Sequence, residues 1–227
     1  MAYIELRGIC KAYKNGNGTL NVLDHLDFEI ERGDRVSVMG RSGSGKTTLL
    51  NVMAGLVVPD CGSYAFSGEE IDYRSERVRR RLRNQKIGYI PQNIPLLFDR
   101  TVLANVKLPL QYRRNHEVKD NDIFELASHL KIETLLDEMP SRLSGGERQK
   151  VGILRVLAQK AELILADEPT GSLDEKSEEE ILEILKELNQ GGKTILMITH
   201  DQNVARICGR RYWLRQGRLT PDSEGKR

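Results

Sequence analysis

The sequence predicts an α/β fold: a parallel sheet with flanking helices, an antiparallel β subdomain at the N-terminus and an inserted helical subdomain. Three observations predict it. Short apolar runs of strand length alternate with longer stretches of helical periodicity. The first part of the chain alternates apolar and polar residues, and the middle part is rich in charged helical sequence. Repeated alternation of strand and helix is typical of a parallel sheet covered by helices.

The N-terminal segment is predicted to be built from strands. Residues 3–30 form a small antiparallel sheet with a tight turn at "KNGNGT". The apolar run "DRVSVMG" is then interpreted as a strand that ends at Gly40. Helical spacing follows in "KTTLLNVMAGL", and Gly55 suits the end of that helix. Strand, glycine-rich loop and helix together make one βα unit.

The middle of the chain is predicted to be inserted into the core. Residues from about 69 to 138 contain the basic run "RVRRRLRNQK" and the amphipathic "DIFELASHLKI", interrupted by the strand-like "IGYIPQ". We expect this segment to form a helical subdomain, whereas residues 1–68 and 139–227 form the core of a single domain. The core resumes with the strand "ELILADE", a helix that stops at Gly191 and the strand "KTILMITH".

The composition limits the class of protein. Of the 227 residues, 39% are hydrophobic and 30% charged, as in ordinary soluble chains, and the net charge of +2 does not argue for nucleic acid. The cysteines Cys10, Cys61 and Cys208 are far apart and odd in number. We therefore expect neither a disulfide framework nor a metal site, as in a reducing cytoplasm. The N-terminus lacks a signal-peptide core and the apolar runs are too short to span a bilayer, so any membrane role requires a partner.

"GRSGSGKTT", residues 40–48, fits the phosphate-binding pattern G-x-x-x-x-G-K-[ST]. Its glycines allow backbone N–H groups to turn inward around phosphates, and Lys46 supplies a compact cation. The Thr47 hydroxyl can ligate Mg²⁺, and the helix that begins there points its positive end at the anion. A chance glycine turn is the alternative, but a strand precedes the loop and a helix follows it. We expect the whole loop to bind nucleotide: Gly40, Arg41, Ser42, Gly43, Ser44, Gly45, Lys46, Thr47 and Thr48.

Two acids and a histidine follow the later strands. Asp167 ends a buried strand, where it can hold the hydration shell of Mg²⁺, and Glu168 is placed to orient or deprotonate the attacking water. The alternative, that these acids only cap the next helix, loses weight behind a complete phosphate loop. His200 follows the next strand, and we expect its imidazole near the γ-phosphate, where it distinguishes ATP from ADP. A structural histidine is the alternative.

With these motifs the chain resembles the nucleotide-binding subunits of ABC transporters, which have a P-loop NTPase core. The family's signature "LSGGQ" is matched by "LSGGE" at residues 143–147. Because two subunits pack head to tail in this family, the resemblance implies a homodimer that sandwiches ATP. Ser144, Gly145 and Gly146 then reach the γ-phosphate bound by the partner's loop, and the helix from Glu147 onward adds its dipole. An ordinary N-capped helix start is the alternative.

Other residues take their roles from the same resemblance. Tyr13 looks like the aromatic residue that stacks on adenine, with a sheet-packing tyrosine as the alternative. Gln92 resembles the glutamine that touches Mg²⁺ and water and links catalysis to the helical subdomain. The resemblance thus implies ATP and Mg²⁺ as cofactors, with a metal site of Thr47, Gln92 and Asp167 and a catalytic set of Lys46, Gln92, Glu168 and His200.

Within the family, "ADEPTGSLD" and "NVKLPLQY" look most like the group of lipoprotein release, macrolide or peptide export and FtsE-like cell-division ATPases. In that group the subunit mechanically drives an integral-membrane permease with a large extracytoplasmic domain. The resemblance implies that the permease contacts the segment between Gln92 and about Arg114. The subunit is then peripheral, at the cytoplasmic face of the inner membrane.

Two other functions stay open. A soluble ABC ATPase acts on nucleic acid, ribosomes or cluster assembly, but the chain has neither the long coiled-coil insertion of DNA-repair relatives nor the second domain of translation relatives. A nucleotide-binding module without turnover has no need of Glu168 and His200. The basic run is interpreted as a solvated helix face, a membrane-surface contact or a nucleic-acid contact, the last being least favoured because no aromatic residues are interleaved for base stacking. Its arginines are Arg77, Arg79, Arg80, Arg81 and Arg83.

Overall fold

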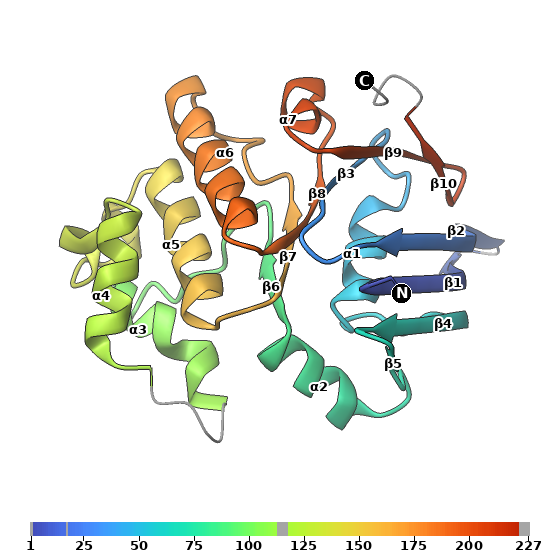
Figure 1. Ribbon diagram of the computed structural model, residues 1–227, viewed down its shortest axis with the longest axis horizontal. Helices are drawn as coiled ribbons and strands as arrows, with labels where there is room; N and C mark the ends of the chain where they lie inside the picture. Colours follow the sequence, from blue (N-terminus) through green and yellow to red (C-terminus); the bar gives the residue numbers. More distant parts are fainter. Residues whose placement is uncertain (1, 17, 113–117, 223–227) are drawn as a thin grey trace.

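The computed structural model describes residues 2–16, 18–112 and 118–222, and its N-terminal part is an antiparallel sheet (Figure 1). Four strands form this sheet in the order β2-β1-β4-β5. Their bounds are Ile4–Asn15 for β1, Gly18–Ile30 for β2, Cys61–Phe66 for β4 and Glu69–Glu70 for β5. The antiparallel subdomain is therefore confirmed, although part of its predicted tight turn, residue 17, lies outside the described residues.

A second sheet forms the centre of the molecule. Its strand order is β10-β9-β3-β8-β7-β6, and every neighbouring pair is parallel except β10 with β9. The strands are β3 (Arg35–Met39), β6 (Ile87–Ile90), β7 (Leu163–Asp167), β8 (Thr194–Ile198), β9 (Arg210–Arg215) and β10 (Arg218–Pro221). This sheet and its helices confirm the predicted α/β class.

Helices cover both faces of the central sheet (Figure 1). On one side, α1 (Lys46–Met53) and α2 (Glu76–Gln85) share a hydrophobic core with the antiparallel sheet. On the other lie α3 (Val102–Lys107), α4 (Asp120–His129), α5 (Gly145–Ala158) and α6 (Glu175–Gln190). Short helices are η1 (Leu108–Tyr112), η2 (Glu133–Leu135), η3 (Pro140–Arg142) and α7 (Gln202–Arg206). Within the described ranges, no helix is both long and apolar enough to cross a membrane.

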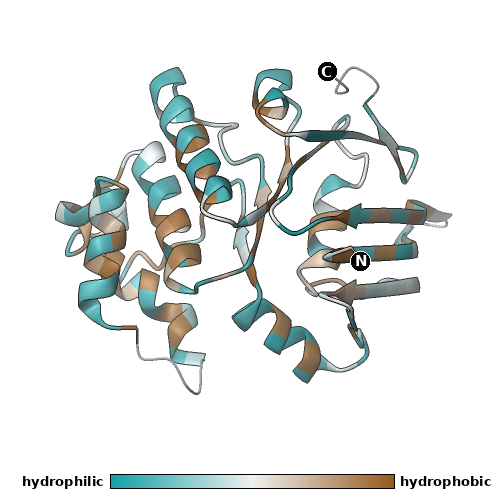
Figure 2. Ribbon diagram, viewed as in Figure 1, coloured by the Kyte–Doolittle hydropathy of each residue, from teal (hydrophilic) through white to brown (hydrophobic). Residues whose placement is uncertain are grey.

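The central strands are hydrophobic on both faces because both are covered. In β7, Leu163 and Leu165 join the core next to α1, whereas Ile164 and Ala166 join the core under α5 and α6. This alternation is the two-residue period of a strand between two layers. Figure 2 shows the complementary pattern on the helices, which change between hydrophobic and hydrophilic residues along their length. The central sheet is therefore packed between two hydrophobic layers.

The boundaries of the inserted helical segment differ from the prediction. β6, expected as an interruption of that segment, is the edge strand of the central sheet and pairs with β7. In the other direction, α5, expected in the core, shares its hydrophobic cluster with α3 and α4. The run "IGYI" is only four residues long, and periodicity alone cannot assign so short a run to a particular sheet.

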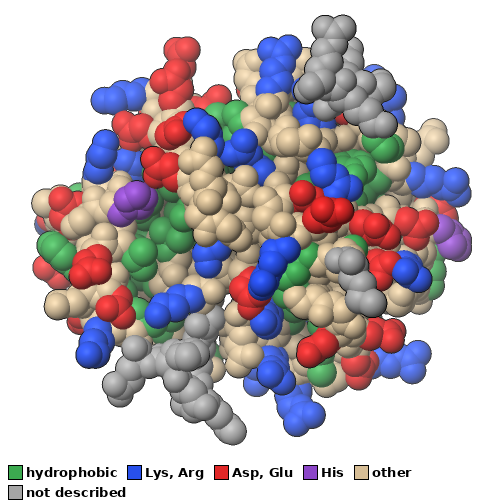
Figure 3. All heavy atoms as spheres, viewed as in Figure 1, with side chains coloured by type: hydrophobic (Ala, Val, Ile, Leu, Met, Phe, Trp, Pro, Cys, Tyr) green, Lys and Arg blue, Asp and Glu red, His purple; other side chains and the backbone are tan. Residues whose placement is uncertain are grey.

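The basic run of α2 is partly structural. Arg83 donates to the Gly55 carbonyl at 2.7 Å and to Glu76 at 2.9 Å. Arg79 also pairs with Glu76, at 2.5 Å. These arginines therefore hold α2 against the end of α1, where Gly55 has the left-handed φ of 64° expected of a helix stop. Figure 3 shows acidic and basic side chains interspersed over one face of the molecule, in keeping with its balanced net charge.

The cysteines depart from the prediction. Cys10 on β1 and Cys61 on β4 are joined in a disulfide, with a Cα–Cα distance of 5.0 Å. The two residues are 51 positions apart, so their spacing gives no sign of a pair; the antiparallel pairing of β1 with β4 places them directly opposite each other. The remaining cysteine, Cys208, is buried.

Candidate nucleotide-binding site

The predicted site residues meet at the carboxyl edge of the central sheet. β3 leads into the phosphate loop at Gly40, and β6 leads to Gln92. β7 ends with Asp167, and β8 is followed by His200. Because these four strands are parallel, their carboxyl ends share one edge. Ligands of open α/β sheets bind at this edge.

A cavity of about 650 Å³ opens there. Its walls come from the phosphate loop, from the ends of the neighbouring strands and from the antiparallel sheet. The lining residues are Tyr13, Val22, Gly40, Arg41, Ser42, Gly43, Gly45, Lys46, Thr47, Thr48, Gln92, Asp167, Glu168 and His200. The structure thus brings together most of the residues predicted to bind nucleotide, although they are spread over most of the sequence.

The phosphate loop is closed around the ammonium of Lys46. This buried side chain donates to the carbonyl of Gly40 at 2.8 Å and to that of Arg41 at 3.1 Å. Gly43 and Gly45 have φ angles of 77° and 101°, a left-handed conformation that favours glycine. The loop therefore has the shape of an anion cradle with a cation already inside it.

Ser44 is the exception within the loop. Its side chain borders a neighbouring hollow together with Trp213 and Leu214 of β9. A Cβ atom at Gly40 would lie 2.6 Å from the Ser44 hydroxyl and 2.7 Å from the Leu214 carbonyl oxygen. Gly40 is thus required by close packing of the loop on β9, and the contact of Ser44 with nucleotide stays a prediction.

Thr47 and Asp167 form the centre of the expected metal site. The Thr47 hydroxyl donates to Asp167 Oδ2 at 2.9 Å. Burial raises the pKa of Asp167 above its ordinary value and the charge of Glu168 adds to this, while the Thr47 hydrogen bond and Lys46 oppose it. These oxygens, with the Gln92 amide on the same cavity wall, are the hard ligands that Mg²⁺ prefers. The residues therefore fit a magnesium ion, whose charge would offset the cost of burying the carboxylate.

Glu168 and His200 are in direct contact. Nδ1 of His200 lies 2.9 Å from Glu168 Oε1, and the backbone N–H of His200 donates to Oε2 at 3.4 Å. Glu168 has a φ of 48°, in the left-handed region that non-glycine residues rarely adopt. Such strain concentrates at functional sites. Glu168 and His200, each expected after the end of a strand, therefore lie at one edge of the sheet and also contact each other, a contact that the sequence did not predict.

Tyr13 and Val22 form the wall contributed by the antiparallel sheet. The ring of Tyr13 is 41% exposed, with Lys11 Nζ 5.5 Å from its centroid. An exposed ring at the mouth of the cavity is available to stack on a base. Val22 was not predicted: its Cγ1 would lie 2.8 Å from a Cβ atom at Gly45. No motif marks Val22, since only the folding of β2 over the phosphate loop brings it there.

The signature residues lie outside this cavity, at the start of α5. Ser144 is the N-cap, and both its N–H and its hydroxyl donate to Glu147 Oε2, at 2.7 and 2.8 Å. The Glu147 N–H donates back to the Ser144 hydroxyl at 3.3 Å. This reciprocal pair is a capping box. The segment is thus an N-capped helix start, and this cap does not depend on phosphate binding.

The two signature glycines have different surroundings. A Cβ atom at Gly146 would lie 2.8 Å from the Ser177 hydroxyl of α6, so packing inside the chain already requires glycine there. At Gly145 the nearest atom is a methyl of Leu173 at 3.5 Å, an ordinary contact. Of the two glycines, Gly145 is thus the one where a Cβ atom would make no tight contact with any residue that the structure describes, which leaves space for a group from elsewhere.

Comparison with known proteins agrees with this site. The ABC transporter family matches residues 23–171. The lipoprotein-releasing system ATP-binding protein LolD 1 of Caulobacter vibrioides is 41% identical over 223 residues, 96% of this chain and 94% of LolD 1. The macrolide export ATP-binding/permease protein MacB of Escherichia coli is 40% identical over 223 residues, which are 98% of this chain but 34% of MacB.

Solved structures give the same result. The dimeric ABC transporter cassette MJ0796 has a TM-score of 0.88 and 36% identity, covering 95% of this chain and 96% of the cassette. A dimeric post-hydrolysis state of the same cassette, bound to ADP and Pi, also has a TM-score of 0.88, with 35% identity and coverage of 96% and 97%. The phosphate loop, the acidic strand end and these similarities together show that the chain belongs to the ABC transporter family, in which it is an ATP-binding and ATP-hydrolysing subunit.

Proposed function

We propose that two copies of this chain hydrolyse ATP in a head-to-tail sandwich and that the resulting motion drives a separate membrane permease. The observation that carries the proposal is the convergence of Lys46, Thr47, Asp167, Glu168 and His200 on one cavity. These residue types bind phosphates, hold Mg²⁺ and orient water, which together are what phosphoryl transfer to water needs.

Each residue of the loop has a distinct task in binding. Lys46 exchanges the carbonyls of Gly40 and Arg41 for oxygens of the β- and γ-phosphates. The loop N–H groups and the positive end of α1 bind the remaining phosphate oxygens. Tyr13 stacks on the adenine. Mg²⁺, when bound by Thr47, Asp167 and Gln92, supplies positive charge that neutralises the phosphates.

Glu168 acts on the water. It orients the water that attacks the γ-phosphorus and accepts a proton from it, while the bond from that phosphorus to the oxygen of ADP breaks. His200 holds the carboxylate in place and reaches toward the γ-phosphate. The rate enhancement comes from positioning and charge stabilisation rather than from a covalent intermediate.

The second copy closes each site. Ser144 turns its hydroxyl from Glu147 to the γ-phosphate held by the partner, and Gly145 allows the phosphate to approach the backbone. The 14-residue helix α5 adds its positive N-terminus. ATP therefore bridges the two copies, and its hydrolysis releases them.

The permease is proposed to contact the segment from Gln92 to Arg114, although Arg113 and Arg114 lie outside the described residues. Three exposed large hydrophobic side chains support this: Leu97, Phe98 and Tyr112, which are 43%, 58% and 74% exposed. The same segment packs closely on α5, because a Cβ atom at Gly152 would lie only 2.5 Å from the Ile94 side chain. Movement at Gln92 can thus pass to both the permease and the signature helix.

The names of two relatives support a proposal about the kind of permease. LolD 1 is named for lipoprotein release and MacB for macrolide export, so we propose export or mechanical work on the far side of the membrane. The chain is then peripheral, at the cytoplasmic face of the inner membrane. The pairing of Arg79 and Arg83 with Glu76 removes part of the charge that a nucleic-acid contact would use.

The test uses Glu168→Gln as bait. This variant, trapped with ATP and mixed with detergent-solubilised native membranes, should retain a permease that mass spectrometry identifies. Lys46→Ala, which cannot hold ATP, is the matched control and should retain much less. Recovery of soluble partners or nucleic acid alone would overturn the permease assignment, and normal turnover by Glu168→Gln would overturn the role of Glu168.

A further inference from the structure

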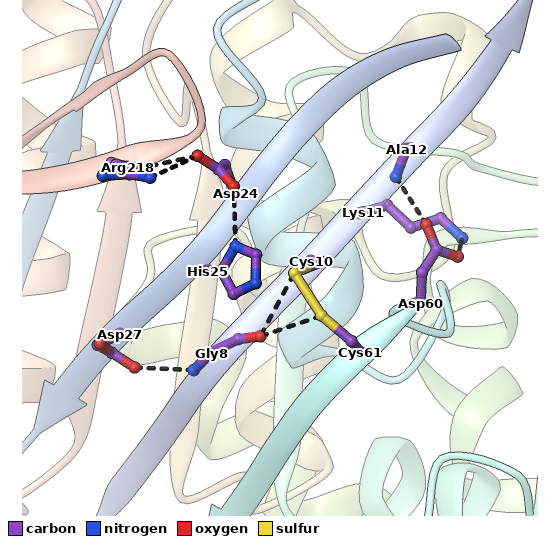
Figure 4. Close-up of a disulfide and its surroundings, with 10 residues drawn as sticks. All are labelled: Gly8, Cys10, Lys11, Ala12, Asp24, His25, Asp27, Asp60, Cys61 and Arg218. Atoms are coloured by element: carbon purple, nitrogen blue, oxygen red, sulfur yellow. Dashed lines mark hydrogen bonds and ion pairs between the residues drawn. A yellow bond between two sulfur atoms is a disulfide. The ribbon is translucent and has the colours of Figure 1, made fainter.

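Outside the nucleotide cavity, the antiparallel sheet gathers two sulfur atoms and an imidazole (Figure 4). They belong to Cys10 on β1, Cys61 on β4 and His25 on β2, and their possible ligand atoms all lie within 4.8 Å of one another. None of the three lines the nucleotide cavity. The cluster is therefore separate from the cavity of the ATPase function proposed above.

The strand pairing explains why His25 points to the cysteines. Ile9 pairs with Leu26 and Lys11 pairs with Leu23, so Cys10 alone on β1 faces two residues of β2, Asp24 and His25. This is a β-bulge, a feature that redirects side chains and that often lies next to functional sites. His25 has the left-handed φ of 44°.

A carboxylate fixes the imidazole. Asp24 Oδ1 lies 2.9 Å from His25 Nδ1, and Figure 4 shows the other ring nitrogen on the side of the sulfur atoms. A histidine that binds a metal through one nitrogen commonly donates its other N–H to a carboxylate in this way. Asp24 is itself held by Arg218 at 2.8 Å.

The cluster is accessible to solvent, and its sulfur atoms are soft metal ligands. Cys61 and His25 are exposed and Cys10 is partly exposed, so an ion can reach it from solvent. The Gly8 carbonyl oxygen also lies beside both sulfur atoms, 3.6 Å from Cys10 and 3.4 Å from Cys61. Two thiolates with one imidazole are typical ligands of zinc, with Zn–S bonds of about 2.3 Å and a fourth position left for water.

We propose that Cys10, Cys61 and His25 bind one Zn²⁺ ion when the cysteines are reduced. Reduction of the disulfide by a dithiol transfers two electrons and two protons to the pair, and the dithiol becomes a disulfide. Both thiols then lose their protons as Zn²⁺ binds. The disulfide form lacks thiolates and does not bind the ion, so zinc binding at this site depends on the redox state.

The test measures zinc directly. The full chain without an affinity tag is reduced with a phosphine and titrated with Zn²⁺ against a chromophoric chelator, and it should take up one ion. Cys10→Ser and His25→Ala should each weaken binding by more than roughly 10–100-fold, the loss that is typical when a residue hydrogen-bonded to a metal ligand is removed. The matched controls Cys208→Ala and His129→Ala should bind as the wild type does.

A second pair of variants separates the site from adventitious binding. Asp24→Ala should weaken zinc binding roughly 10–100-fold, whereas Arg218→Ala, which removes a partner of Asp24 but keeps the carboxylate beside His25, should weaken it less. ATP binding by each variant reports whether it is folded. The proposal would be overturned if the reduced wild type bound no more zinc than Cys10→Ser or His25→Ala. It would also be overturned if the disulfide form bound as much zinc as the reduced form.

Discussion

His200 engages both carboxylate oxygens of Glu168: its ring nitrogen Nδ1 lies 2.9 Å from Oε1, and its backbone N–H lies 3.4 Å from Oε2. The two residues follow the ends of neighbouring parallel strands, β7 and β8. Glu168 is also held at the backbone, where its N–H donates to the Ile198 carbonyl at 2.9 Å. The carboxylate proposed to activate water is thus placed by β8 before any substrate arrives, which is how preorganised catalysis is built.

Removal of the imidazole should therefore affect turnover more than binding. We expect His200→Ala to lower the rate constant for ATP hydrolysis about 100-fold, near the lower end of the effect of general-base catalysis, because Glu168 loses its partner. The dissociation constant for ATP should change less than about threefold, since Lys46 and the loop are untouched. His129→Ala, a histidine beside Glu187 on the surface, should leave both unchanged. Single-turnover kinetics and nucleotide titration separate the two quantities.

Glu147 gives a second prediction. Its carboxylate accepts hydrogen bonds from the Ser144 N–H and hydroxyl, and this hydroxyl is proposed to bind a phosphate. Glu147→Gln keeps an oxygen for the cap but removes a negative charge from that place. We expect ATP-dependent dimerisation to become several-fold tighter, while the variant chain loses roughly 0.3–1 kcal/mol of stability through the weaker interaction with the helix dipole. Sedimentation of the Glu168→Gln background with and without this change measures the first effect. Weaker dimerisation would place the signature away from the phosphate.

The nucleotide site could be predicted largely from the sequence because its parts are contiguous. The loop that ends in Lys46 and Thr47 carries its own strand, turn and helix, and Asp167 follows an apolar run that can only be buried. Once the strands are parallel, their ends meet at one edge. The site residues that follow each parallel strand can therefore be identified from the order of the motifs in the sequence.

Features that depend on contact between distant segments could not be predicted in this way. Cys10 and Cys61 become partners only through the pairing of β1 with β4, and Val22 reaches the phosphate loop only when β2 folds over it. The place of β6 at the edge of the central sheet likewise depends on its partner β7. The left-handed backbone of Glu168 has no sequence signal either, since glutamate rarely adopts that conformation.

Glu162 predicts a pH dependence of stability. Tyr3, Arg32 and Lys86 lie 3.0, 2.9 and 2.5 Å from its carboxylate, which ties the two sheets together. Burial opposes ionisation, but the Lys86 and Tyr3 hydrogen bonds outweigh it and lower the pKa of Glu162 below 4.5. A carboxyl group with a lowered pKa stabilises the fold at any pH above its pKa in the unfolded chain. This stabilisation is lost as the pH falls through its pKa in the folded chain.

We therefore expect Glu162→Gln to cost on the order of 1 kcal/mol at neutral pH, because three partners lose a charged acceptor. The difference from the wild type should stay constant down to about pH 4.5 and shrink in more acidic solution. Denaturant titrations at several pH values measure it. Glu183→Gln, on the exposed face of α6, should show no comparable loss; an equal loss would mean that surface charge in general, and not this cluster, is responsible.

Gly88 predicts a packing effect. A Cβ atom there would lie 2.2 Å from a methyl of Val156 and 3.1 Å from the Ala161 side chain, so β6 and α5 would have to separate. Gly88→Ala should lower the free energy of unfolding by roughly 1–3 kcal/mol, as overpacking of a core does. The control is Gly209→Ala, where no described atom lies within 4 Å of the new Cβ, and its effect should stay within about 0.5 kcal/mol. Similar losses in the two variants would show that contact with Val156 is not what requires glycine.

Asp167 is expected to lower the stability of the nucleotide-free protein while it serves in metal binding. The residue is only 8% exposed, and burial raises the pKa of its carboxyl group, so its charge is costly in the absence of a cation. Asp167→Asn keeps an acceptor for the Thr47 hydroxyl and removes that charge. We expect the nucleotide-free variant to melt at a higher temperature than the wild type, whereas ATP with Mg²⁺ should raise the melting temperature of the wild type much more than that of the variant. Thermal unfolding with and without ligand measures both. Equal stabilisation by Mg²⁺-ATP in the two chains would contradict the assignment of Asp167 as a metal ligand, because the wild type is expected to recover the cost of its buried charge only when the cation binds.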